Sequence, residues 1–270
     1  MMRALALAAV VAWAAVPFTG LAAEAPPPTL QLAPDPDLSD PGRTSRQCLA
    51  LARRQPDKAI ELAGKWIGLG GGESAKYCQA LSLVGLKEYG EGARRLEDLA
   101  RTSKQDMAAR AGMLAQAGQA WMLQGEPGRA YAAQSTALRT APQGTKQHFE
   151  ILLDRAGTLA EAGKYSEALV DVNAALVIDP RSADALAFRA SAYRYQGEID
   201  KALDDAQRAL SLDPKNLAAL LERGNLHRLK KRLADARQDW LRILDLDPDS
   251  PAADSARLNI EHLDVDAGAR

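Results

Sequence analysis

The stretch ALSLDPKNLAALLERG, residues 209–224, has helical patterning on both sides of Asp213-Pro214, so one helix ends there and another begins at once. The same arrangement recurs at Asp179-Pro180 and at Asp247-Pro248. The three prolines follow one another at intervals of 34 residues. A fixed interval of roughly 20–50 residues indicates a repeat architecture. The three Asp-Pro dipeptides are therefore predicted to be the joints of a tandem array.

Counted backwards from each proline, the same types of residue recur at the same offsets. Leucine stands 28 residues before the proline, a small residue 24 before and alanine 12 before: Leu152, Leu186 and Leu220, then Ala156, Ala190 and Gly224, then Ala168, Ala202 and Ala236. These positions form two apolar stripes at helical spacing, separated by a break at Gly163, Gly197 and Lys231. Each repeat is predicted to be a helix, a short turn and a second helix, packed closely at the small residues.

The same pattern continues upstream and ends downstream in a single helix. Pro142 anchors a fourth unit, and the 38 residues from Pro142 to Pro180 leave four extra residues, within QGTKQH, for a longer joint. We predict two degenerate units over residues 42–110 and four regular units over 111–250. Ser250 as N-cap and Pro251 at the first helical position open a capping helix over 251–264, followed by a tail over 265–270.

These columns resemble the tetratricopeptide repeat, a 34-residue helix–turn–helix unit with the signature W-x2-L-G-x2-Y, then A-x3-F, then P. One repeat matches it with Leu186, Ala190, Tyr193, Ala202 and Pro214. The last repeat departs from it, since His227 replaces the usual aromatic or leucine and Lys231 the usual glycine. The resemblance implies an all-α fold: an α-solenoid, a right-handed superhelix of about six units with a C-terminal capping helix. Because one helix pair buries too little to fold alone, we expect a continuous array.

The N-terminus has the layout of a secretory signal peptide over residues 1–23. A positive MMR precedes an apolar run of 13 residues and a small-residue exit, and the run is shorter than the ~20 residues of a membrane-spanning helix. We expect cleavage after Ala22 or Ala23, no transmembrane segment after it, and a periplasmic or secreted protein; an uncleaved anchor helix is the alternative. Residues 24–41, rich in Pro and Asp, are predicted to be a disordered linker.

Composition and motifs argue against catalysis, nucleic acid and metal. The net charge is −1 and aromatic residues make up 5%, which does not favour a nucleic-acid partner. The three histidines are far apart in sequence, neither H-E-x-x-H nor C-x-x-C occurs, and GLGGGESAK over residues 68–76 lacks the spacing of a phosphate loop. We expect no enzyme activity, no cofactor and no metal site.

Cys48 and Cys78 are predicted to lie on the first helices of consecutive units, which are neighbours in the tetratricopeptide fold. In an oxidising compartment such a pair is expected to form a disulfide. Two buried free thiols are the alternative.

The resemblance also implies a concave groove, lined by the first helices, that binds a peptide or protein. By register its residues are Gln119, Met122, Phe188, Ser191, Arg194, Tyr195, Asn225 and Arg228. Phe188 and Tyr195 can take an apolar anchor, while Arg194 and Arg228 can hold a carboxylate. The alternative for the two aromatic residues is packing between units.

The expected function is a non-catalytic periplasmic protein–protein interaction module that serves as a scaffold or assembly factor. A maturation or chaperone-like factor for envelope or cytochrome assembly is an alternative, as is an accessory subunit of a cell-envelope enzyme or an enzyme without a recognisable motif. The cytosolic chaperone-tail clamp of the family is not expected, because only Asn225 agrees with its residues.

Overall fold

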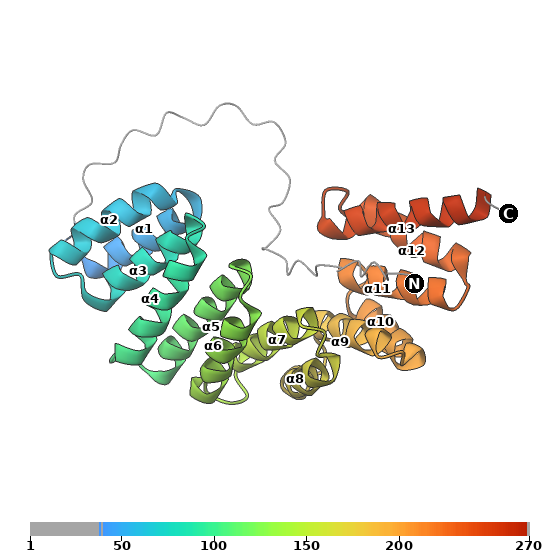
Figure 1. Cartoon of the computed structure of the whole chain (residues 1–270), viewed down its shortest axis with the longest axis horizontal. Helices are drawn as coiled ribbons and strands as arrows, with labels where there is room; N and C mark the ends of the chain where they lie inside the picture. Colours follow the sequence, from blue (N-terminus) through green and yellow to red (C-terminus); the bar gives the residue numbers. More distant parts are fainter. Residues whose placement is uncertain (1–37, 39, 269–270) are drawn as a thin grey trace, which may run out of the picture. The chain divides into compact units, whose positions relative to one another are not determined.

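The computed structural model describes residue 38 and residues 40–268, with side chains up to residue 265. In this part of the chain it contains thirteen α-helices and no strand (Figure 1). The helices are α1 (Pro41–Arg54), α2 (Pro56–Gly68), α3 (Gly72–Gly85), α4 (Tyr89–Thr102), α5 (Met107–Leu123), α6 (Pro127–Thr140), α7 (Lys146–Glu161), α8 (Tyr165–Ile178), α9 (Ala183–Tyr195), α10 (Ile199–Leu212), α11 (Leu217–Leu229), α12 (Leu233–Leu246) and α13 (Pro251–Gly268). The predicted signal peptide, and the linker apart from its last residues, lie outside the described residues.

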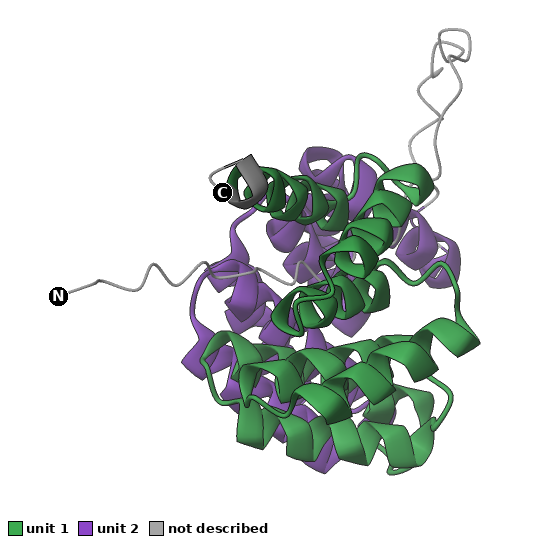
Figure 2. Ribbon diagram, turned by 90° about the vertical axis from the view of Figure 1, so that its right-hand side faces the viewer, with its two compact units in different colours: residues 1–11, 142–270 green, residues 12–141 purple. Residues whose placement is uncertain are grey.

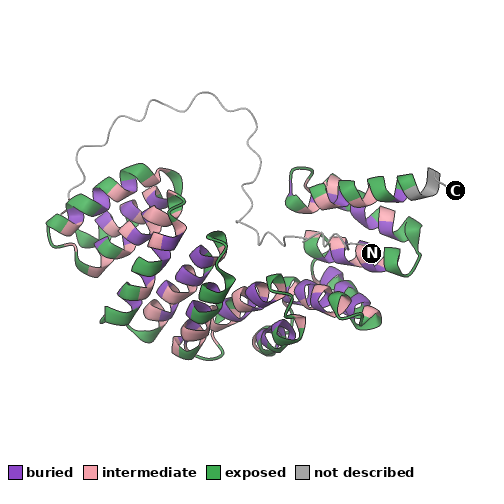
Figure 3. Cartoon of the chain, viewed as in Figure 1, coloured by how far each residue is buried: buried purple, intermediate pink, exposed green. Residues whose placement is uncertain are grey.

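Successive helices pair into hairpins, from α1 with α2 to α11 with α12, and α13 follows as a single helix. This confirms the predicted all-α architecture of stacked helix–turn–helix units. Buried residues occur along the helices and alternate with exposed ones (Figure 3). Most of the buried residues are alanine and leucine, as the two apolar stripes of each repeat predict.

The described chain divides into two compact units between Ala141 and Pro142 (Figure 2). The N-terminal unit contains α1 to α6, and the C-terminal unit contains α7 to α13. The division falls at the joint that the four extra residues lengthen. The expectation of one continuous array did not anticipate this division.

The Asp-Pro joints of the C-terminal unit have a recurring geometry. At the first two joints the aspartate Oδ1 accepts a hydrogen bond from the backbone N–H two residues later, in Asp179 from Arg181 and in Asp213 from Lys215, each at 3.0 Å. The second residue after each proline then caps the next helix: Ser182, Asn216 and Ser250 accept from backbone N–H groups at 3.2, 2.9 and 3.2 Å. The joint therefore ends one helix and begins the next within a few residues, as the 34-residue interval predicted.

At each of the first two joints, an arginine of the following hairpin donates a hydrogen bond to a carbonyl oxygen of the joint. Arg208 Nη2 donates to the carbonyl oxygen of Pro180 at 3.0 Å, and Arg242 Nη2 donates to that of Pro214 at 3.2 Å. These carbonyls belong to turn residues and have no partner within a helix, so the arginines satisfy groups that the joint leaves open. Neighbouring hairpins are thus linked by hydrogen bonds as well as by apolar packing.

In each hairpin the size of the small residue in the first helix is complementary to the size of the residue that faces it in the second helix. Ala190 and Ala206 pack in one buried cluster with Ala202 and Leu226. In the next hairpin the equivalents are Gly224 and Trp240, and a Cβ added to Gly224 would approach Trp240 Cδ1 to 2.8 Å. A larger residue in the second helix therefore requires a glycine in the first.

Three predicted boundaries differ from the structure. The capping helix α13 continues to Gly268 rather than ending at 264, because residues 264–267 contain no Pro or Gly to stop it. Helix α1 begins at Pro41, inside the predicted linker 24–41, because Asp40 Oδ1 caps it by accepting from Arg43 N–H at 3.0 Å. The predicted limit between 42–110 and 111–250 falls inside α5, which begins at Met107 after its N-cap Asp106.

Candidate functional site

Contacts between successive first helices define the candidate site. In the C-terminal unit α9 contacts α11, and α11 contacts α13. Arg194 of α9 reaches Glu222 of α11, and Asn259 Nδ2 of α13 donates to Asn225 Oδ1 of α11 at 3.1 Å. We call the surface formed by Arg194, Glu222, Asn225 and Asn259, with the neighbouring residues of α9, α11 and α13, the first-helix face. It corresponds to the surface that the sequence register predicted for a partner.

Arg194 already holds a carboxylate of its own chain. Its Nε and Nη2 donate to Glu222 Oε2 at 2.6 Å and Oε1 at 3.1 Å. Burial alone would lower the pKa of Arg194, but the hydrogen bond and charge of Glu222 outweigh burial and raise that pKa. The predicted role of Arg194 as a ligand for a partner's carboxylate is therefore corrected, because a bidentate internal pair occupies the guanidinium.

The two aromatic residues of the predicted groove have different environments. Phe188 is only 9% exposed, so it contributes to packing and offers little surface to a partner. Tyr195 is 41% exposed, and its ring stacks on Tyr165 with centroids 4.5 Å apart while the Arg194 guanidinium lies 4.2 Å from its centroid. Tyr195 thus presents a fixed aromatic edge at the end of α9.

The remaining predicted residues fall in both units. Ser191 is half-buried on α9, and Asn225 and the exposed Arg228 lie on α11. Gln119, which is exposed, and Met122, which packs against a buried cluster around Trp121, lie on α5 of the N-terminal unit. The six residues on α9 and α11 therefore belong to the C-terminal unit, and the two on α5 belong to the N-terminal unit.

Sequence reasoning missed Leu229, which is 46% exposed in the last turn of α11. It stands 34 residues after Tyr195, just as Arg228 stands 34 after Arg194. The repeat interval was sufficient to find it. On α9 and α11, Tyr195, Arg228 and Leu229 are the exposed side chains with the size that binding surfaces use.

Sequence reasoning also missed a repeated ion pair inside the hairpins of the C-terminal unit. Two bidentate arginine–aspartate pairs, Arg155 with Asp171 and Arg223 with Asp239, have N–O distances between 2.5 and 2.9 Å and link first to second helix. The central hairpin has the same pair in Arg189 and Asp205. The signal was present as two columns at the 34-residue interval. The pairs engage the buried carboxylates of α8, α10 and α12.

His227 lies beside the last of these pairs. Its Nε2 is 3.9 Å from Asp239 Oδ2, yet burial of the ring lowers the pKa of His227 more than the nearby Asp239 raises it. The imidazole is therefore held preferentially neutral inside the hairpin.

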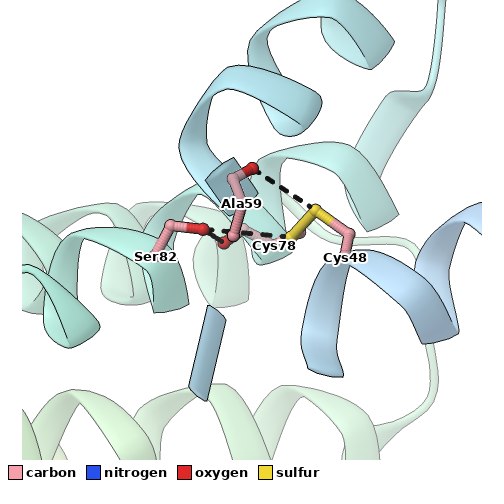
Figure 4. Close-up of a disulfide and its surroundings, with 4 residues drawn as sticks. All are labelled: Cys48, Ala59, Cys78 and Ser82. Carbon is pink, nitrogen blue, oxygen red and sulfur yellow. Dashed lines mark hydrogen bonds between the residues drawn. A yellow bond between two sulfur atoms is a disulfide. The ribbon is translucent and has the colours of Figure 1, made fainter. Parts of the chain in front are cut away.

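The N-terminal unit carries a disulfide between Cys48 of α1 and Cys78 of α3 (Figure 4). The Cα atoms lie 6.0 Å apart, and both cysteines are fully buried in a cluster with Leu62 and Ala63. Ser82 Oγ, one turn further along α3, donates to the carbonyl oxygen of Cys78 at 2.8 Å. The bond ties the first helices of two consecutive hairpins together.

The same described residues include neither a metal cluster nor a helix that could span a membrane. They contain no group of three or more His, Cys, Asp or Glu side chains placed to hold a metal ion. No helix among them has the length and apolar character needed to cross a membrane.

Comparison with known proteins identifies the repeat and the fold. Residues 189–251 match the family described as Tetratricopeptide repeat. No curated protein sequence matches the chain. Among solved structures, "MamA 41-end from Desulfovibrio magneticus RS-1" aligns with a TM-score of 0.56 and 22% identity, over 66% of this chain and 97% of that chain. "Crystal structure of YrrB: a TPR protein with an unusual peptide-binding site" aligns with a TM-score of 0.51 and 17% identity, over 76% and 98%. The chain thus has a tetratricopeptide-repeat segment over residues 189–251 and shares the fold of MamA and YrrB.

Proposed function

We propose that this chain is an exported, non-catalytic interaction module of the tetratricopeptide-repeat class that binds a protein or peptide on its first-helix face. The observation that carries the proposal is the exposure of Tyr195, Arg228 and Leu229 on α9 and α11, whose other large side chains are buried, half-buried or paired. The sequence match over 189–251 includes α11 and most of α9, which carry these residues.

The charged groups of the C-terminal unit support binding rather than catalysis. The buried aspartates of α8, α10 and α12 are each paired with an arginine of their own hairpin, so these carboxylates are not presented to a substrate. YrrB, of the same fold, is described as having a peptide-binding site, and that precedent agrees with the role proposed here.

Two observations support export to the periplasm or the cell exterior. The first 23 residues have the pattern of a signal peptide, and the buried disulfide is of the kind that forms mainly in oxidising compartments. Cell fractionation and thiol labelling of the denatured protein test this. We expect a shortened chain in the periplasmic fraction with no reactive thiol. A full-length cytoplasmic chain with two free thiols would reject export.

Affinity capture from an envelope extract tests the binding face. The test variant is Tyr195→Ala/Arg228→Gln, which removes exposed groups and leaves the buried Phe188 in place. The matched control is Val177→Ala/Arg181→Gln, which changes exposed residues at the end of α8 and in the joint after it. We expect recovery of a specific partner to fall only with the test variant, while both variants remain folded. Equal recovery by all three proteins would reject the face.

A further inference from the structure

We propose that Arg228 binds a carboxylate of the partner, so that the α11–α13 part of the first-helix face selects acidic peptides. The inference rests on the proposed function and names the chemistry of its ligand. It follows from comparing two arginines that occupy the same position in consecutive repeats.

In the first of the two repeats the chain supplies the carboxylate itself. Arg194, in the last turn of α9, makes two hydrogen bonds to Glu222 in the middle of α11. The pair shows that a side chain at this position of a first helix can reach across to the next first helix. It also shows that the site geometry accepts a carboxylate in a bidentate arrangement.

In the second repeat the carboxylate is missing. Arg228 stands 34 residues after Arg194, and the residue 34 after Glu222 is Ala256 of α13, which is fully buried and carries no acceptor. Within the described residues Arg228 forms no ion pair, and its side chain is exposed. The position therefore has the cation of the internal pair without its carboxylate, and the exposed guanidinium of Arg228 can take the carboxylate of a ligand.

The surroundings of Arg228 suit an acidic peptide with an apolar neighbour. Leu229 is exposed beside it, and the Asn225–Asn259 pair bridges α11 and α13 one turn away. His262 of α13 stands 34 residues after Arg228 and is also exposed, so no acidic residue occupies that position of the next helix. Asp264, one turn from Ile260 on α13, is paired with Arg237.

Selection of random linear peptides displayed on phage, against the purified protein, tests the inference. We expect the wild-type protein to enrich peptides with Asp or Glu, and Arg228→Glu to lose that enrichment in favour of Lys and Arg. The matched control Arg181→Glu changes an exposed arginine outside the face and should select the same peptides as the wild type. For a selected acidic peptide, Arg228→Gln should weaken binding by about tenfold or more.

A second variant tests the repeat comparison without removing the arginine. Ala256→Glu places a carboxylate where Glu222 stands in the preceding repeat, and it should pair with Arg228 and weaken the same peptide to a similar extent. If Ala256→Glu does not fold, the Arg228 variants still decide the question. Selected peptides without acidic bias, or an acidic bias unchanged in Arg228→Glu, would overturn this inference alone. Enrichment of no peptide by the wild type would instead contradict the proposed function.

Discussion

Arg189 and Asp205, 16 residues apart, form a bidentate ion pair between the two helices of their hairpin. The Nε–Oδ2 and Nη2–Oδ1 distances are 2.7 and 2.8 Å, and Arg189 Nη1 also donates to Asn173 of the preceding hairpin at 2.8 Å. The hydrogen bond to Asp205 raises the pKa of Arg189. One side chain therefore fixes both the helix pair and its neighbour.

Removal of the aspartate should destabilise the C-terminal unit. Asp205→Ala leaves a partly buried guanidinium without its carboxylate, and we expect a loss of about 2–3 kcal/mol in the free energy of unfolding. Urea denaturation followed by circular dichroism measures it. The double variant Arg189→Leu/Asp205→Leu should lose less than Asp205→Ala, because it leaves no unpaired charge. A single variant as stable as the wild type would mean that the pair makes no net contribution.

Gly224 should be intolerant of a methyl group although it lies within a helix. Its Cβ would overlap the indole of Trp240, so Gly224→Ala should cost about 1–3 kcal/mol despite the better helix propensity of alanine. Thermal melts of Gly224→Ala, Trp240→Val and the double variant compare the crowded site with the small–medium pairing that Ala156 and Val172 have in another repeat. Gly224→Ala should cost less when residue 240 is already valine, because the indole that crowds the added methyl group is then absent. An equal cost in both backgrounds would show that crowding by Trp240 is not the cause.

Replacing Lys231 with glycine, the residue that other repeats have in this turn, should stabilise the folded protein. It has φ 61°, whereas Gly125, Gly163 and Gly197 have φ values of 78°, 72° and 79° in the equivalent turns. A left-handed conformation costs a non-glycine residue about 1–2 kcal/mol. Lys231→Gly should therefore raise the melting temperature, and Gly197→Ala should lower it. A lower melting temperature for Lys231→Gly would contradict the assigned turn.

His227 should make the C-terminal unit sensitive to acid. Burial lowers its pKa in the folded state, so below the ordinary histidine pKa the unfolded chain binds a proton that the folded chain does not. Stability should therefore fall as the pH is lowered through the ordinary histidine pKa toward the depressed one. Melting of the wild type and of His227→Tyr, which copies Tyr193 of the preceding repeat, measures the difference. An identical acid response in both proteins would exclude His227 as its source.

The fold was predictable because the residues that end its helices recur at a fixed interval. Pro180, Pro214 and Pro248 fixed the joints, and the alanine and leucine columns fixed the face that each helix buries. The division at Pro142 was not anticipated, although the sequence showed the longer joint. The residues of a single repeat do not show whether a longer joint separates two compact units.

The sequence predicted which helices carry the candidate residues, but not the contacts that their side chains make. The register placed Phe188 and Arg194 on the correct helix, but whether they are available depends on their neighbours. Glu222 on the next helix occupies Arg194, and packing encloses Phe188. The hairpin ion pairs were not predicted because charged residues on helices are usually solvated. The pairing becomes visible only when the arginine positions and the aspartate positions of successive repeats are compared together.

Photo-cross-linking in living cells shows where a partner contacts the chain. A photoreactive amino acid at Leu229, on the first-helix face, is compared with one at Val177, which is 82% exposed on α8 outside this face. Binding of a protein partner on the first-helix face predicts a discrete cross-linked adduct from position 229 and none from position 177. An adduct from 177 with none from 229 would contradict the account.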